Sequence, residues 1–171
     1  MVQFAILKTD LGNFGILISE SKLIKIILPN KLESIPIKVD NPKKYEPFMI
    51  DVLKQLSQYF NGSRKQFELD LKLQISPFYQ KVLNEVCKIP YGQTCSYKNI
   101  AEKIKNTRAH RAVANANATN PIPIVIPCHR VIQSNGELGK YGGGKGLKHS
   151  LIEKEKNSNM LNYQSKFLLN H

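Results

Sequence analysis

The sequence has no run of about 18 or more apolar residues, the length that a membrane-spanning helix needs. Its start, Met1-Val2-Gln3-Phe4-Ala5, lacks the basic flank and the small-residue cleavage site of a secretory signal. Cysteine is scarce: three residues without a paired CxxC spacing argue against a disulfide scaffold and against a zinc site. These absences predict an intracellular, cytoplasmic protein with no metal and no membrane contact.

Acidic side chains are also few, because 13 Asp and Glu stand against 25 Lys and Arg, a formal net charge of +12. The excess lies mainly in the second half of the chain. Residues 1–76 hold 11 basic and 8 acidic side chains, whereas residues 77–155 hold 12 and 5. This imbalance fits either a lysine-rich solvated surface or a polyanionic partner, and such a partner would bind after residue 76.

The first part of the chain is predicted to form a small α/β domain over residues 1–76, an antiparallel sheet plus a helix. Three apolar, β-branched stretches predict its strands, at residues 2–7, 14–18 and 23–28. Four prolines then predict a loop: Pro29, Pro36, Pro42 and Pro47. Helical spacing of apolar residues from Phe48 to Phe60 predicts a helix that ends at Asn61-Gly62. The alternation from Phe67 to Ile75 fits an edge strand or an extended connector, and the expected role of this domain is scaffolding.

The second part, residues 77–171, is predicted to be a mostly α-helical domain. A helix is expected over residues 77–87, and Ser96 can cap a short helix that begins at Tyr97. Another helix begins about four residues later, near Ala109, so the pair is a helix-turn-helix candidate. Basic residues cluster in it: Lys98, Lys103, Lys105, Arg108 and Arg111. The small outward residues of the second helix favour sequence-independent DNA binding over base reading.

A rigid apolar segment leads to Cys128. Three prolines within seven residues, from Pro121 to Pro127, prevent a helix, and the Ile/Val residues between them favour burial. His129 and Arg130 follow the cysteine directly, and neighbouring positive charge lowers the pKa of a thiol. Since neighbours in sequence generally point apart, His129 needs a bridging water or a tight turn to act on the sulfur. The alternative is a buried structural thiol.

The segment Ile126-Pro127-Cys128-His129-Arg130-Val131 lies inside a longer pattern, with Asn120-Pro121 before it and Gly139 and Tyr141-Gly142-Gly143 after it. This pattern resembles the active-site signature of the O6-alkylguanine-DNA alkyltransferases. The resemblance covers about residues 77–155, and residues 1–76 match only in their strands-then-helix layout. It implies DNA repair by single-turnover transfer of an alkyl group, such as methyl, from O6 of guanine in double-stranded DNA to Cys128. It further implies a monomer that flips the damaged base and needs no cofactor.

The resemblance also implies catalytic roles. Cys128 is the alkyl acceptor, His129 takes its proton through a water, and Glu155 on the last helix orients His129. Asn120 stabilises the turn that carries the cysteine. Tyr97 supports the leaving guanine by proton donation. The thiolate is a suitable nucleophile for a soft alkyl carbon, which is out of reach until the base leaves the stack.

The substrate-binding roles follow from the same resemblance. Arg111 enters the base stack as the target nucleotide rotates out. The DNA backbone is contacted by Tyr97, Lys98, Asn106 and Ser134. The flipped base is held at Val131, Tyr141 and Gly142. Departures from the family pattern lie at Asn115, Asn117 and Gly142, and Cys87 and Cys95 are expected to be core thiols.

Other functions fit the sequence less well. Residues 139–145 resemble a phosphate-binding loop, but Gly146 replaces the Ser or Thr that would bind Mg²⁺. A cysteine hydrolase needs an oxyanion hole, for which no residues stand out. The closest alternative is a non-enzymatic alkylguanine-binding repair factor. Such relatives lack the cysteine, so Cys128 favours the transferase.

Overall fold

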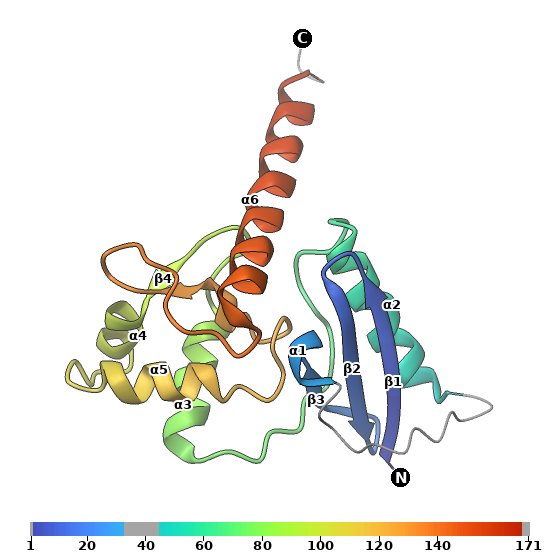
Figure 1. Ribbon diagram of the computed structural model, residues 1–171, viewed down its shortest axis with the longest axis horizontal. Helices are drawn as coiled ribbons and strands as arrows, with labels where there is room; N and C mark the ends of the chain where they lie inside the picture. The colour runs from blue at the N-terminus through green and yellow to red at the C-terminus, as the bar shows by residue number, and fades with distance from the viewer. Residues whose placement is uncertain (1, 33–44, 169–171) are drawn as a thin grey trace.

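The computed structural model describes residues 2–32 and 45–168, with side chains as far as residue 158. Figure 1 shows a small sheet with helices beside it, next to a mostly helical part from which the C-terminal helix projects. Within the described part of the chain, no helix is both long enough and apolar enough to cross a membrane. The predicted fold class, an α/β part followed by a helical part, is confirmed.

The sheet has three antiparallel strands in the order β1-β2-β3, namely β1 (Val2–Thr9), β2 (Gly12–Ser19) and β3 (Lys22–Ile27). Its central strand buries Phe14, Ile16 and Ile18 in the core. Helix α2 (Pro47–Phe60) packs against the sheet at β1. The apolar residues that it buries are Met49, Val52, Leu56, Tyr59 and Phe60. The strands and the helix lie where the sequence pattern predicts them.

Two connections in this part refine the prediction. The chain at the first of the four prolines forms a one-turn helix, α1 (Pro29–Leu32), rather than a loop, because proline is well tolerated in the first helical turn. Pro36 and Pro42 lie outside the described residues. The alternating segment 67–75 is an extended connector, not a strand of the sheet. It meets β3 in a single bridge at Leu23, whose N–H donates to Asp70 O at 2.8 Å.

The helical part contains α3 (Pro77–Cys87), α4 (Tyr97–Lys103), α5 (His110–Ala118) and α6 (Gly144–Leu168). The Ser96 hydroxyl caps α4 by accepting from Asn99 N at 3.0 Å, as the sequence predicts. Helices α3, α4 and α5 pack on one another. A two-residue parallel pair joins β4 (Cys95–Ser96) to β5 (Val131–Ile132), directly after the cysteine segment.

One apolar core runs through both parts of the molecule. Buried residues of the sheet and of α2 belong to the same cluster as Val82 and Leu83 of α3 and Leu151 of α6. The backbone joins the parts as well, because Ile26 N in β3 donates to Pro121 O at 2.9 Å. The sheet therefore lies directly against the segment that leads to Cys128.

Candidate active site

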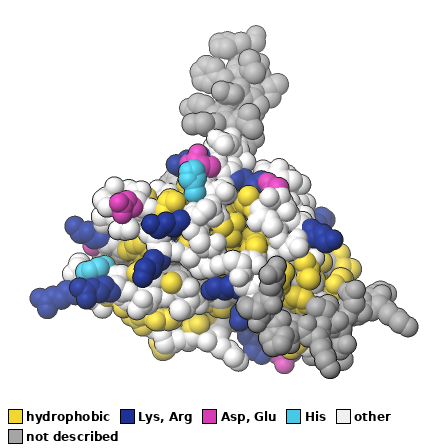
Figure 2. Space-filling model, viewed as in Figure 1, with side chains coloured by type: hydrophobic (Ala, Val, Ile, Leu, Met, Phe, Trp, Pro, Cys, Tyr) yellow, Lys and Arg dark blue, Asp and Glu magenta, His cyan; other side chains and the backbone are white. Residues whose placement is uncertain are grey.

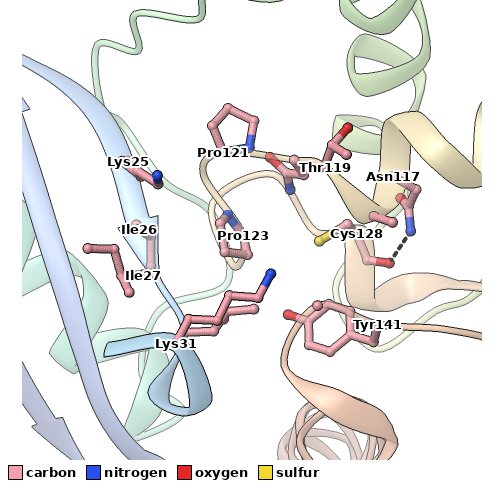
Figure 3. Close-up of a pocket in the computed structure, with 14 residues that line it drawn as sticks. Lys25, Ile26, Ile27, Lys31, Asn117, Thr119, Pro121, Pro123, Cys128 and Tyr141 are labelled. Atoms are coloured by element: carbon pink, nitrogen blue, oxygen red, sulfur yellow. Dashed lines mark hydrogen bonds between the residues drawn. The ribbon is translucent and has the colours of Figure 1, made fainter. Parts of the chain in front are cut away.

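Cys128 begins a single 3-10 turn, η1 (Cys128–Arg130), at the end of the proline-rich segment. Asn120 stabilises this segment at both ends. Its Nδ2 donates to Ile126 O at 2.8 Å, and its Oδ1 accepts from Ile122 N at 3.0 Å. The thiol is 2% exposed and lines a cavity of about 270 Å³ between β3–α1 and the end of α5 (Figure 3).

The 3-10 turn directs three consecutive side chains into different surroundings. Cys128 faces the cavity, whereas His129 and Arg130 turn toward Glu155 on α6. His129 Nε2 lies 2.6 Å from Glu155 Oε1. The Arg130 guanidinium makes two hydrogen bonds to the same carboxylate, at 2.9 and 3.0 Å, and a third to Ile89 O at 2.7 Å. A tight turn is thus present at this point, but it directs the His129 ring to Glu155 rather than to the Cys128 sulfur.

Glu155 accepts five hydrogen bonds although it is 1% exposed. Besides His129 and Arg130, the donors are the Tyr59 hydroxyl at 2.7 Å and Gly92 N at 3.0 Å. Burial raises the pKa of this carboxyl, but the hydrogen bonds of His129 and Arg130, the Arg130 charge and, in acid where the ring is protonated, the His129 charge outweigh burial and bring the pKa to about 2. Glu155 is therefore ionised at every physiological pH.

His129 is neutral at rest. It is fully buried, and burial lowers its pKa more than the Glu155 carboxylate raises it. With Nε2 donating to the carboxylate, the ring presents Nδ1 as an unprotonated acceptor. Among the described residues Nδ1 has no hydrogen-bond partner, and it is buried. An imidazole in this state can accept one proton and share the resulting charge with Glu155.

The expectation that positive neighbours lower the pKa of the Cys128 thiol is wrong in its net effect. Burial raises that pKa, and this outweighs the opposing interactions with Asn120, Lys148 and Tyr141. The reason is geometric, since His129 is uncharged and Arg130 directs its charge to Glu155. Cys128 is thus a neutral thiol at rest, which reacts only when its proton can leave.

Lys148 is a site residue that the sequence analysis missed. Its side chain is buried, and its ammonium donates to Val131 O at 2.5 Å and to the Tyr97 hydroxyl at 3.4 Å. Burial lowers its pKa to about 8, although the charge of a Cys128 thiolate opposes that change. One sequence signal was available. Lys148 stands seven residues before Glu155, two turns along the same helix face.

Tyr59 is the second missed residue, and it comes from the part that was expected to act only as a scaffold. Its hydroxyl is buried, donates to Glu155 and lies 3.4 Å from His129 Nε2. No sequence signal distinguishes it, because an aromatic residue on the inner face of α2 resembles any other core residue. The sheet part therefore contributes the Tyr59 hydroxyl to the charged cluster behind the thiol.

Two of the three residues predicted to hold the base line the Cys128 cavity, and Val131 is not among its lining residues. Tyr141 and Gly142 line it, and Figure 3 shows the Tyr141 hydroxyl directed into it. Val131 follows the 3-10 turn, with its carbonyl accepting from Lys148. Tyr97 is half-buried near Gly139, where an added Cβ would lie 3.2 Å from the Tyr97 ring. The loop at Gly142 is also fixed from the sheet part, because Asn30 Nδ2 donates to Gly142 O at 3.1 Å.

The residues predicted to contact DNA lie outside the cavity. Arg111, Lys98, Asn106 and Ser134 are all exposed. Lys98 and Ser134 line one surface depression beside β4 and β5. In Figure 2, basic side chains are frequent over the end of the molecule that carries α4 and α5, while acidic ones are sparse. The structure thus separates a buried reactive thiol from an exposed basic surface.

The buried carboxylate gives the fold a specific acid sensitivity. Because the pKa of Glu155 is about 2 in the folded protein and its ordinary value is 4.5, its stabilising effect is complete above about pH 5 and is lost as pH falls toward 2. The free energy of unfolding should fall by about 3 kcal/mol from this group between pH 5 and pH 2. Urea denaturation across that range measures it. Glu155→Gln should remove most of the pH slope, and an unchanged slope would contradict the assignment.

Both parts of the chain are similar to domains of known proteins. Residues 2–73 match the family model of the 6-O-methylguanine DNA methyltransferase ribonuclease-like domain, and residues 77–157 match that of the DNA-binding domain of the same enzymes. A methylated-DNA–protein-cysteine methyltransferase of Methanosarcina barkeri is 44% identical over 111 residues, which cover 65% of this chain and 70% of the relative. A Mycobacterium bovis protein of the same name is 47% identical over 102 residues, or 60% of this chain and 62% of the relative.

Solved structures agree over nearly the whole chain. The O6-methylguanine methyltransferase of Mycobacterium tuberculosis superposes with a TM-score of 0.75 at 33% identity, covering 92% of this chain and 94% of that one. The same enzyme in complex with DNA superposes with a TM-score of 0.76 at 32% identity, covering 91% and 94%. The resemblance first seen around Cys128 is confirmed, and the chain belongs to the methylated-DNA–protein-cysteine methyltransferase family.

Proposed function

We propose that this protein repairs double-stranded DNA by moving an alkyl group, typically methyl, from O6 of guanine to its own Cys128. The observation that carries the proposal is the juxtaposition of a thiol in a cavity with a neutral buried imidazole, which is itself held by an ionised carboxylate. Family membership and the DNA complex of a relative at 32% identity support the same substrate. Each molecule acts once, because a thioether on Cys128 has no route back to the thiol.

The thiol proton leaves through His129. The Cys128 proton passes by way of a water to Nδ1, the unpaired nitrogen of the buried ring, and Glu155 stabilises the imidazolium that forms. The thiolate sulfur then attacks the alkyl carbon. The S–C bond forms as the bond from that carbon to O6 breaks, and the electron pair of the broken bond goes to the guanine.

The leaving guanine gains a proton. Tyr97 is the donor in this scheme, and the Lys148 ammonium beside its hydroxyl stabilises the negative charge that develops there. Asn120 acts earlier by holding the loop that carries Cys128. Val131, Tyr141 and Gly142 hold the flipped base against the thiol. Neither the alkyl transfer to Cys128 nor the protonation of the leaving guanine requires a cofactor.

DNA binding is assigned to the basic surface of residues 77–171, as one of two domains that divide after residue 76. Lys98, Asn106 and Ser134 contact the phosphates, and helix α5 enters the groove with Arg111 replacing the flipped base. The protein acts as a monomer, since one chain supplies every residue of the scheme. Its location is intracellular, where its DNA substrate is found.

Intact-protein mass spectrometry tests the function. Incubation with duplex DNA containing O6-methylguanine should add the mass of one methyl group per molecule, and peptide mapping should place it on Cys128. Methyl appearing on Cys87 or Cys95, or repeated turnovers per molecule, would rule out the mechanism. A non-enzymatic alkylguanine-binding factor would bind the same DNA and gain no mass.

Arg111 separates base flipping from chemistry. Arg111→Ala should slow repair of a duplex substrate by about tenfold to a hundredfold, since flipping costs a few kcal/mol. A free O6-alkylguanine base needs no flipping, so its reaction with Cys128 should change little. The ratio of the two single-turnover rates is the measurement. Equal losses with both substrates would assign Arg111 to the thiol site or to the fold.

A further inference from the structure

Two lysines of the sheet part line the mouth of the Cys128 cavity. Lys25 lies in β3 and Lys31 in α1, and both residues are exposed. Within the part of the chain that the structure describes, they are the only charged residues that line this cavity. The lining supplied by the end of α5 and the segment after it, residues 117–121 and 123, contains no cation. Positive charge at this mouth therefore comes from the sheet part.

Lys25 stands where two hollows of the surface meet. The next residue, Ile26, donates its N–H to Pro121 O at 2.9 Å, which holds β3 against the segment that leads to the thiol. Lys25 lines the Cys128 cavity and also a second hollow of about 410 Å³. The other polar residues of that second hollow are Ser19, Lys72, Gln74 and Thr119. Because the two hollows also share Thr119 and Pro121, the depression continues from the thiol over Lys25 onto the sheet part.

Lys31 is held at the same mouth by α1. The neighbouring Asn30 donates from Nδ2 to Gly142 O at 3.1 Å, which fixes this turn of helix to the loop that carries Tyr141. Figure 3 shows the Lys31 ammonium directed across the cavity, toward the side that Cys128 and Tyr141 line. A Cβ added at Gly142 would lie 3.4 Å from Lys31 Nζ. The ammonium is thus at the opening of the cavity and not on a remote surface.

A nucleotide whose base enters the cavity keeps its phosphates outside. The base is joined through its sugar to a phosphodiester on each side, so these anions must pass the mouth when the base is flipped. Lysine ammonium groups bind phosphates as point charges and carry no sequence information. No carboxylate of the described residues lines the mouth to compete with an anion. The charge, exposure and position of Lys25 and Lys31 therefore match the DNA backbone beside an extruded nucleotide.

We propose that Lys25 and Lys31 bind the phosphates that flank the flipped nucleotide, which makes the sheet part a second arm of the DNA interface. The inference rests on the proposed function, which assigns DNA binding to residues 77–171, and extends it to the part that was expected to act only as a scaffold. The contact forms when the base is in the cavity, because only then does the backbone pass the mouth. The two lysines stabilise the flipped state and take no part in the transfer of the alkyl group.

The test removes both charges and compares DNA with a free base. On an O6-methylguanine duplex at low salt, Lys25→Gln with Lys31→Gln should lower the second-order rate constant of single-turnover transfer by on the order of tenfold. The slope of its logarithm against the logarithm of salt concentration should become shallower by about two, since each lost phosphate contact removes about one released counterion. Transfer from free O6-methylguanine should stay within about twofold of wild type, because counterion release requires phosphates.

Matched variants and an undamaged duplex are the controls. Lys8→Gln with Lys22→Gln removes the same net charge from exposed positions of the sheet that do not line the cavity, and should change the rate constant less than about twofold. Lys25→Arg with Lys31→Arg keeps both charges and should retain the wild-type salt slope. Binding of undamaged duplex, measured by titration, should have the same salt slope in the Lys25/Lys31 glutamine variant as in wild type, because no nucleotide enters the cavity.

The outcomes are distinct. If the Lys25/Lys31 glutamine variant keeps the wild-type salt slope on the methylated duplex, or if the Lys8/Lys22 variant or the arginine variant loses as much, the inference is overturned. An equal change of slope on undamaged duplex also overturns it, since such a contact would not need a flipped nucleotide. A matching loss with the free base would assign the lysines to the thiol site or to the fold. Transfer of methyl to Cys128 from neither substrate in the wild-type protein would instead contradict the proposed function.

Discussion

Cys128→Ala should abolish alkyl transfer and leave the affinity for undamaged duplex DNA within about twofold of wild type, because phosphate contacts supply most of that affinity. Among the described residues, Cys128 is the only thiol that lines its cavity, and no other side chain there is a comparable nucleophile for an alkyl carbon. The removed sulfur should cost the fold only about 1 kcal/mol. Mass spectrometry after incubation with methylated DNA measures the first effect, and a binding titration measures the second.

The controls are the two remaining cysteines. Cys87 is exposed, so the expectation that it is a core thiol is wrong. Cys95 is partly buried, and neither cysteine lines the cavity. Cys87→Ala and Cys95→Ala should each still accept one methyl group per molecule. Residual transfer by Cys128→Ala would require a second acceptor and would invalidate the assignment of the site.

Glu155→Gln should both destabilise the protein and slow the chemistry. The change leaves the Arg130 guanidinium buried without its counter-charge, and breaking such a pair costs about 3–5 kcal/mol of unfolding free energy. It also removes the negative charge that stabilises the His129 imidazolium, so transfer should fall by about a hundredfold or more. Urea denaturation and single-turnover kinetics on the folded protein measure the two effects separately.

Glu153→Gln is the matched control. Glu153 lies on the same helix two residues earlier, where it is about half exposed and pairs with Lys156 at 3.2 Å. Loss of that surface pair should cost less than about 1 kcal/mol and should leave transfer unchanged. If the two variants behaved alike, the buried carboxylate would have no special role.

Much of the fold followed from local sequence patterns. Strand alternation, the Ser96 cap and the apolar stripe of α3 are each determined by neighbouring residues, so the sequence alone predicts them. The family was recognisable because the residues around Cys128 are contiguous. The one-turn helix at Pro29 was missed because four residues are too few to show a helical period.

The electrostatics of the site could not be predicted in the same way. Whether His129 and Arg130 lower the pKa of the thiol depends on where a 3-10 turn directs them, and the turn directs both toward Glu155. The cation that does influence the thiol is Lys148, from a helix formed later in the chain. Burial, which dominates the pKa of Cys128, depends on the tertiary structure and not on its neighbours in sequence.

The hydrogen bonds to Glu155 also mean that the Cys128 site is completed late in the synthesis of the chain. Ribosomes extend a chain from its N-terminus, so Cys128 and His129 are made before Glu155, which follows His129 by 26 residues and Tyr59 by 96. Until α6 is complete and has docked, His129 has no carboxylate and Arg130 has no counter-charge. An unfinished chain therefore carries the acceptor thiol in an inactive form. A protein that reacts once thus becomes competent only when the turn of α6 that carries Glu155 is in place.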